Sequence, residues 1–246
     1  MALTNVQADE KRIYGILKLN GEDTDQTDSN NSSDSEQGRH ITKETVGNVQ
    51  VALWQDVSGG CGGRTWEAAY VMIKYMLWKE RQGETSFLSG KKILDLGSGT
   101  GLVGLAMAKA CPSLAHMELT DQIPMMSLLH DNILLNQLQD KVSASVLNWG
   151  EPTDHTVDIV FASDCVYLEV AFQPLVDTLV MLTENNNNVQ IYMSYRKRRK
   201  ADKRFFGLAR KQFNIIDIMD DPERPVYSRQ GLHLYRLERK IHHHHH

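Results

Sequence analysis

The sequence lacks most features of disulfide-rich, membrane-spanning or nucleic-acid-binding proteins. Its three cysteines form no C-x-x-C pair, which argues against a disulfide scaffold or a zinc ribbon and favours a reduced, intracellular setting. There is no secretory signal, and no apolar run approaches the ~18 residues that a membrane span requires. The formal net charge of −4 is not the basic excess of a nucleic-acid binder. We therefore expect a cytoplasmic protein that binds neither a membrane nor, directly, a nucleic acid.

The sequence also offers little evidence for a metal site. Of its ten histidines, five form the terminal run His242–His246, which is typical of an expression tag and is set aside. The others are too scattered to predict a metal cluster, so we expect no bound metal. No pattern specifies an oligomer, and a monomer is the default expectation.

The first 40 residues differ in composition from the rest of the chain. Residues 21–40 contain no large apolar side chain, so this segment cannot bury enough surface to offset the entropy of ordering it. This composition predicts an acidic, disordered linker, with a regulatory or docking segment as the alternative. We divide the chain into an N-terminal extension (1–40), a folded domain (41–241) and the tag (242–246).

Within the folded domain, strand-like and helix-like apolar patterns alternate along the chain. Such alternation predicts an α/β fold, a Rossmann-like and mostly parallel sheet with helices on both faces. Val157–Ala162 is almost entirely apolar, which predicts a central strand covered on both faces. Predicted strands span 48–57, 93–96, 116–120, 142–147, 157–162, 189–194, 215–219 and 232–237; predicted helices span 66–81, 101–111, 123–135, 171–183 and 201–213.

One stretch organises the domain: Lys91–Gly104, K-K-I-L-D-L-G-S-G-T-G-L-V-G, an apolar strand, a glycine-rich turn and a helix. The glycines allow a sharp turn and a close approach to a ligand, and the helix presents free N–H groups at the same place. Gly99-x-Gly101-x-x-Gly104 matches the dinucleotide fingerprint, and Asp121 follows about 20 residues later, as an NAD site requires. NAD is therefore one expected cofactor.

Asp95, two positions before the first glycine of the turn, favours a different cofactor. A carboxylate at this strand tip would repel a pyrophosphate but suits the ammonium and sulfonium charges of S-adenosyl-L-methionine. Asp121, at the tip of the second strand, then binds the ribose hydroxyls through two acceptor oxygens, and a helix N-cap is its alternative role. We favour S-adenosyl-L-methionine, with NAD as the alternative.

Further motifs can be compared with known families: Gly62–Trp66 (G-G-R-T-W), Leu94–Gly104, Leu119–Asp121 (L-T-D), Trp149–Pro152 (W-G-E-P) and Ala162–Tyr167 (A-S-D-C-V-Y). Together they resemble the seven-strand, class I S-adenosylmethionine-dependent methyltransferases. Within that class they resemble the lysine methyltransferases of non-histone proteins, methyltransferase family 16. The resemblance covers the chain from about residue 45 and implies a protein-lysine N-methyltransferase. Tyr195–Phe206 most resembles the fungal members that methylate translation elongation factor 1A.

The resemblance also implies which residues hold the cofactor. Trp66 would pack against it from the helix before the sheet, and Trp149 would lie near the adenine, with plain core packing as the alternative for both tryptophans. Ser163 would contact the cofactor where related chains often have alanine. The predicted cofactor-binding residues are Trp66, Asp95, Gly97, Ser98, Gly99, Asp121, Trp149 and Ser163, of which residues 97–99 would form the floor of the methionine and ribose site.

The reacting groups are predicted in the motif D-C-V-Y, Asp164–Tyr167, after the central strand. Methylases of nucleic-acid bases commonly carry prolines at the two middle positions, so Cys165 and Val166 weaken that alternative. A lysine with a reference pKa of ~10.4 is neutral in only about one molecule per thousand near physiological pH, which is equivalent to roughly 4–5 kcal/mol. We assign Asp164 to orienting the substrate amine, with general-base work secondary and structural capping as the alternative. Tyr167 is predicted to form a channel wall, and Cys165 to be a small buried residue rather than a nucleophile.

A basic run, Arg196–Arg204, follows a predicted strand at the same sheet edge. It suggests a positive rim for an acidic surface of a folded protein substrate, with a solvated face or a nuclear-targeting patch as alternatives. Elongation factor 1A is the preferred partner, and the valosin-containing AAA ATPase or an Hsp70-type chaperone are alternatives within the family. Outside it, an NAD-dependent oxidoreductase and a non-catalytic cofactor-binding scaffold remain as alternatives.

Overall fold

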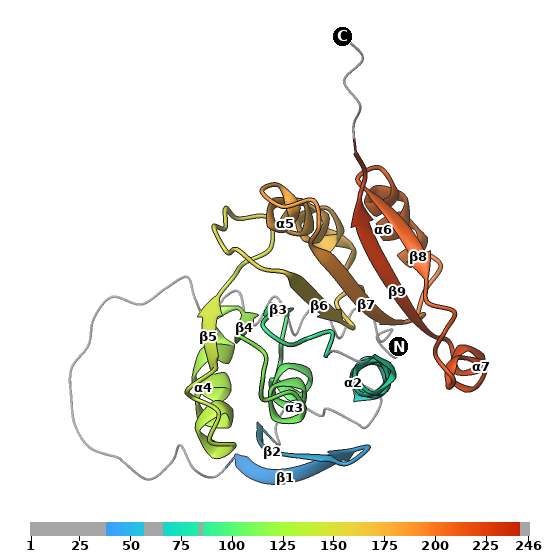
Figure 1. The fold of residues 1–246 in the computed structure, drawn as a ribbon. Helices are drawn as coiled ribbons and strands as arrows, with labels where there is room; N and C mark the ends of the chain where they lie inside the picture. Colours follow the sequence, from blue (N-terminus) through green and yellow to red (C-terminus); the bar gives the residue numbers. More distant parts are fainter. Residues whose placement is uncertain (1–37, 57–65, 84–85, 242–246) are drawn as a thin grey trace, which may run out of the picture. The chain divides into compact units, whose positions relative to one another are not determined.

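The computed structural model describes residues 38–56, 66–83 and 86–241. Its main element is a seven-stranded sheet in the order β5-β4-β3-β6-β7-β9-β8 (Figure 1). The first five strands in this order are parallel, and β9 pairs antiparallel with both β7 and β8. The fold class is therefore confirmed. The strands are β3 (Lys92–Leu96), β4 (His116–Asp121), β5 (Val142–Val146), β6 (Ile159–Ser163), β7 (Gln190–Arg196), β8 (Phe213–Asp217) and β9 (Leu232–Arg239).

Two hydrophobic cores lie on the two faces of this sheet. Side chains alternate between the faces along a strand, so Ile93 of β3 joins one core while Leu94 and Leu96 join the other. Strand β6 lies at the centre of the sheet and is fully buried along Ile159–Ala162, as its apolar sequence predicts. Because strands and helices alternate along the chain, helices cover both faces of the sheet, and the ends of the strands are where a site can form.

Helices α2, α3 and α4 cover one face of the sheet, and α5 and α6 cover the other (Figure 1). The predicted helix at 123–135 starts with a 3-10 turn, Ile123–Met125, before α4 begins. The predicted helix at 201–213 is too long. Helix α6 ends at Arg210, and Phe213, whose side chain is buried in the core, is the first residue of β8. The helices are α2 (Trp66–Gln82), α3 (Leu102–Ala110), α4 (Met126–Leu135), α5 (Phe172–Thr183), α6 (Asp202–Arg210) and α7 (Arg224–Tyr227).

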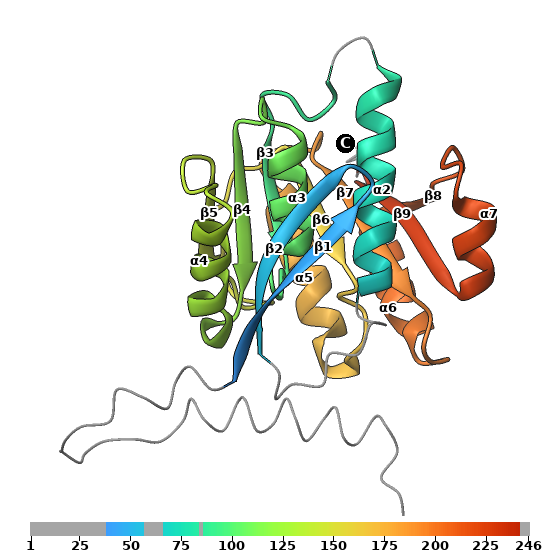
Figure 2. The same ribbon diagram turned by 90° about the horizontal axis from the view of Figure 1, so that it is seen from below.

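A separate antiparallel hairpin, β1 (Arg39–Val46) and β2 (Val49–Asp56), packs against α3 and α4 (Figure 2). The sequence pattern predicted β2 but not its pairing with β1. Asn132 of α4 and Asn136, the C-cap residue of that helix, bind the backbone of β2: their side-chain oxygens accept the Trp54 and Ala52 N–H groups at 2.6 and 3.0 Å. The side-chain amide of Asn132 also donates to the Thr100 carbonyl at 2.8 Å. The hairpin is thereby tied to the glycine-rich turn.

Several predictions fall outside the described residues. They concern the acidic extension up to residue 37, the family motif at 62–65 and the C-terminal tag, and they remain predictions. Across the part of the chain that the structure covers, no helix combines the length and apolar composition needed to cross a membrane. In the same residues, no cluster of three or more His, Cys, Asp or Glu could hold a metal ion.

Candidate active site

The predicted site residues meet where the parallel strands end. The glycine-rich turn follows β3, Asp121 ends β4, and Asp164 follows β6. Strand order reverses between β3 and β6, because β4 and β5 continue from β3 on one side while β7 follows β6 on the other. In open α/β sheets, ligands bind at this switch point, outside the carboxyl ends of the strands.

The glycine turn packs against side chains from two other loops. Gly97 has a φ of +63°, a left-handed conformation that side chains rarely adopt. A Cβ there would lie 3.2 Å from Trp149 Cζ2 and 3.4 Å from Cys165 Sγ. The turn, the loop after β5 and the loop after β6 are thus packed together at Gly97. Gly99 has a similar φ of +59° but open space on the side where a Cβ would stand.

This difference predicts unequal effects of two alanine substitutions. Both Gly97→Ala and Gly99→Ala force a Cβ into the left-handed region, at a cost of about 1–2 kcal/mol. Gly97→Ala must also displace Trp149 or Cys165, which adds about 1–3 kcal/mol of overpacking. Urea unfolding should therefore show a larger loss of free energy of unfolding for Gly97→Ala. Equal losses for the two variants would contradict the packing of Trp149 on Gly97.

Asp95 is almost completely buried on β3, with 2% of its surface exposed. Burial raises its pKa to about 7, although hydrogen bonding by Ser98 and Gly104 lowers it in part. Its Oδ2 atom has no hydrogen-bond partner among the described residues. An unpartnered buried carboxylate oxygen beside the glycine turn fits a cationic group of a ligand, as the sequence predicted for S-adenosyl-L-methionine.

Asp121 joins the end of β4 to the glycine turn. Its Oδ2 accepts the Gly99 N–H at 2.9 Å, and its Oδ1 accepts the Gln122 N–H at 2.7 Å. Burial raises its pKa, and these two backbone hydrogen bonds oppose the shift. Each carboxylate oxygen has a further lone pair, so the predicted binding of ribose hydroxyls remains compatible with this geometry. The alternative role as a helix N-cap is not seen, because neither the 3-10 turn at Ile123–Met125 nor α4 has a side-chain cap and Asp121 binds the backbone amides of Gly99 and Gln122 instead.

The remaining predicted cofactor residues differ in their positions. Trp149 is half-buried, packs against the core on the α5 face and faces Gly97. Trp66 starts α2, is half-buried and packs against the core on the other face. Ser163 ends β6, and its hydroxyl accepts a hydrogen bond from Ser194 at 3.0 Å. Trp149 thus lies beside the glycine turn, and its predicted place near the adenine stays a prediction, whereas the contacts of Trp66 are those of core packing.

Asp164 forms a bidentate ion pair that the sequence did not predict. Arg198 Nη1 donates to Oδ1 at 2.8 Å, and Nη2 donates to Oδ2 at 2.6 Å. The Asp164 side chain is 10% exposed and that of Arg198 is 32% exposed. Asp164 has a φ of +56°, in a left-handed region where aspartate and asparagine are enriched among non-glycine residues. The predicted catalytic carboxylate is thus held by a fixed cation.

The basic run is therefore not simply a row of solvated charges. All four of its arginines have carboxylate partners, and the partner of Arg198 is Asp164, a residue of the candidate site. Reversing the charge of Arg198 would break its pair with Asp164, so it is not a clean test of a docking rim. The pairs are Arg196–Glu67, Arg198–Asp164, Arg199–Asp202 and Arg204–Glu169. Only the presence of the run could be found from the sequence, because pairing depends on how the loops fold back.

Cys165 is buried, as the sequence predicted, and the role of Tyr167 as a channel wall stays a prediction. Tyr167 is 41% exposed, and burial, followed by nearby acidic groups, raises its pKa to about 12, so its phenol stays neutral at physiological pH. Cys165 is buried, and its thiol donates to the Leu96 carbonyl at 3.3 Å. Burial raises the pKa of this thiol well above its usual value. A neutral, buried thiol is a poor nucleophile.

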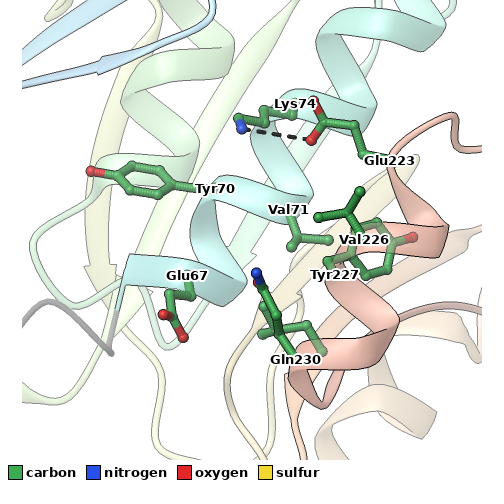
Figure 3. Close-up of a pocket in the computed structure, with 9 residues that line it drawn as sticks. Glu67, Tyr70, Val71, Lys74, Glu223, Val226, Tyr227 and Gln230 are labelled. Atoms are coloured by element: carbon green, nitrogen blue, oxygen red, sulfur yellow. Dashed lines mark ion pairs between the residues drawn. The ribbon is translucent and has the colours of Figure 1, made fainter.

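A small groove lies away from the glycine turn, between α2 and α7 (Figure 3). It has a volume of about 220 Å³, and Lys74 and Glu223 form an ion pair of 3.6 Å beside it. None of the predicted site residues lines it. The lining residues are Glu67, Tyr70, Val71, Lys74, Glu223, Val226, Tyr227, Gln230 and Leu232.

The sheet order, the glycine turn at the switch point and the acidic residues at the ends of β3, β4 and β6 define a class I S-adenosylmethionine-dependent methyltransferase. The solved structure of the T. thermophilus 16S rRNA N2 G1207 methyltransferase shares the fold, with a TM-score of 0.56 and 15% identity over 82% of this chain and 51% of that chain. Likeness at this identity concerns the fold alone.

Sequence comparison identifies the family. Residues 46–212 match the family described as lysine methyltransferase. The chain is 38% identical to the protein-lysine N-methyltransferase EFM6 of Saccharomyces cerevisiae, over 74% of this chain and 82% of that protein. It is 31% identical to the protein N-lysine methyltransferase METTL21A of Danio rerio, over 78% and 84% of the two chains. The chain belongs to the lysine methyltransferase family and is an S-adenosyl-L-methionine-dependent protein-lysine N-methyltransferase. Membership decides against the NAD-dependent oxidoreductase and the non-catalytic scaffold.

Proposed function

We propose that this enzyme methylates a lysine of translation elongation factor 1A in the cytoplasm. The observation that supports this substrate is the resemblance of Tyr195–Phe206 to fungal enzymes that act on elongation factor 1A. The similarity to the yeast protein-lysine N-methyltransferase EFM6 supports a protein lysine as the acceptor. The observation that carries the proposed chemistry is the position of the D-C-V-Y motif directly after β6, where Cys165, between Asp164 and Tyr167, packs against Gly97 of the glycine turn.

The residues at this edge divide into a donor side and an acceptor side. Gly97, Ser98 and Gly99 form the floor for S-adenosyl-L-methionine, Asp95 faces its positive charge and Asp121 binds its ribose hydroxyls. When bound, this cofactor supplies an electrophilic methyl group. Trp149 contributes a flat apolar surface against Gly97, and Ser163 and Trp66 complete the proposed donor side.

On the acceptor side, Asp164 accepts an N–H of the substrate amine and directs its lone pair toward the methyl group. The half-exposed ring of Tyr167 forms a wall of the channel, and its neutral phenol keeps that wall uncharged. Aligning the two reactants in this way supplies a large part of the rate acceleration, because a bimolecular encounter becomes a reaction within one complex.

Incubation with radiolabelled S-adenosyl-L-methionine tests the substrate. We expect label on purified elongation factor 1A, and mass spectrometry of its peptides should place the methyl group on a lysine. The valosin-containing AAA ATPase and an Hsp70-type chaperone, at equal concentration, are the matched alternatives. Labelling of either of these in place of elongation factor 1A would overturn the proposed substrate but not the class of enzyme.

A further inference from the structure

The ion pair between Asp164 and Arg198 bears on how the substrate lysine loses its proton. Each oxygen of the Asp164 carboxylate accepts one N–H of the guanidinium, at 2.8 and 2.6 Å. Bidentate arginine–carboxylate pairs have a defined geometry and are among the stronger charged hydrogen bonds. One acceptor position on each oxygen is therefore taken before a substrate binds, and further lone pairs remain.

The loop that carries Arg198 is held in place by the buried Asp202, whose exposure is 2%. Oδ2 of Asp202 accepts the Tyr195 hydroxyl at 2.6 Å and the backbone N–H groups of Arg198 and Arg199 at 3.2 and 3.3 Å. The N–H of Lys197 donates to the Gly231 carbonyl at 2.9 Å. The backbone is fixed on both sides of Arg198, so its guanidinium reaches Asp164 from an ordered position.

This inference rests on the proposed function. We propose that Arg198 is a positioning residue that stays paired with Asp164 and favours the neutral form of the substrate lysine. An unpaired carboxylate beside the amine would stabilise the ammonium form, which has no lone pair to attack with. The positive charge of Arg198 offsets the negative charge of Asp164. It also lies near the substrate amine, where it repels the positively charged ammonium form. The ammonium then gives its proton to solvent. Asp164 orients the free amine and does not take its proton, because protonation would break the bidentate pair.

Apart from Arg198, the groups that act electrostatically on Cys165, Tyr167 and Tyr195 around this pair are carboxylic acids, phenols and a thiol. The adjacent cations Lys197 and Arg199 lie on the same loop, and Arg199 pairs with Asp202 instead. The acidic neighbours favour the ammonium form, and the phenols and the thiol stay neutral. Hydrogen bonding to Asp164 raises the pKa of Arg198 further, so its charge persists throughout the working range of the enzyme. These neighbours are Asp95 on β3, Asp121 on β4, Cys165 and Tyr167 after β6, Tyr195 on β7 and Asp202 on α6.

The pH dependence of kcat for the labelled protein substrate tests this role. Arg198→Met keeps an unbranched apolar side chain in place of the arginine stem but removes the charge. In this variant, the acid limb of the plot of kcat against pH should move up by at least about one pH unit. The value of kcat near pH 7.5 should then fall about tenfold and recover at higher pH. Arg198→Lys keeps the charge, so its profile should stay within about 0.3 units of wild type. Arg204→Met, which breaks the 3.3 Å pair with Glu169 in the same basic run, is the matched control and should not move the profile.

The alternatives give distinct results. A uniform loss of kcat at every pH in Arg198→Met, or no change at all, would overturn the proposed role. Equal rises in KM for Arg198→Met and Arg204→Met, without a shifted profile, would also overturn it and indicate a docking rim instead. Arg198→Gln provides a second neutral variant if Arg198→Met does not fold, and cofactor binding by calorimetry confirms that each variant is intact. If wild-type enzyme labels another protein, the proposed substrate fails, and the same pH series is measured on that protein.

Discussion

Asp164→Asn is expected to lower kcat for lysine methylation by roughly 100-fold or more while leaving cofactor affinity unchanged. Asparagine has nearly the same shape as aspartate and tolerates a φ of +56°, so the backbone at this position should be preserved. The substitution removes the negative charge and one acceptor, and leaves Arg198 without its carboxylate partner. The amine would then be oriented poorly beside an uncompensated cation. Single-turnover methylation and a calorimetric titration of S-adenosyl-L-methionine measure the two effects separately.

A comparable ion pair elsewhere provides the control. Asp217 binds Arg224 at 2.7 Å at the end of β8, so Asp217→Asn removes a similar pair outside the site. This control should keep kcat within about twofold of wild type, because exposed ion pairs contribute little. Methylation by Asp164→Asn at more than about one-tenth of the wild-type rate would contradict the role assigned to Asp164.

Asp121→Ala should weaken the binding of S-adenosyl-L-methionine by about 100-fold. Charged hydrogen bonds are each worth about 1.5–3 kcal/mol, and loss of the proposed contacts with the ribose corresponds to about 3 kcal/mol, or two orders of magnitude in Kd. The substitution also removes the 2.9 Å hydrogen bond that the Gly99 N–H donates to Asp121, so the glycine turn loses one of its restraints. Isothermal titration calorimetry gives the Kd directly.

Glu118→Ala is the matched control for this prediction. Glu118 lies on the same strand and interacts with His116 and Ser143, away from the glycine turn. Its loss should leave Kd within about threefold of wild type and affect stability alone. A Kd for Asp121→Ala that is no weaker than that of Glu118→Ala would show that Asp121 only shapes the turn.

Much of the fold could be predicted because its signals are local. The strand before the glycine turn and the apolar run of β6 both appear within a few consecutive residues, and both lie where the sequence placed them. The hairpin could not be predicted in the same way. Its docking depends on Asn132 of α4 and on Asn136 at the end of that helix, whose side chains form hydrogen bonds to backbone groups 78 and 84 positions away. Within a helical pattern, a polar residue of this kind looks like part of a solvated face.

The site shows the same division. The sequence by itself determined the glycine turn in which we propose that the methyl donor binds, because a strand, glycines at fixed spacing and a following helix form a turn from neighbouring residues alone. The family motifs added Asp164 and Tyr167 at the adjoining sheet edge. Only the tertiary structure decided which charge faces Asp164, because Arg198 is 34 positions away and reaches it through a loop held by Asp202. Electrostatic partners depend on distances in space, and a sequence pattern records only the charges that are available to pair.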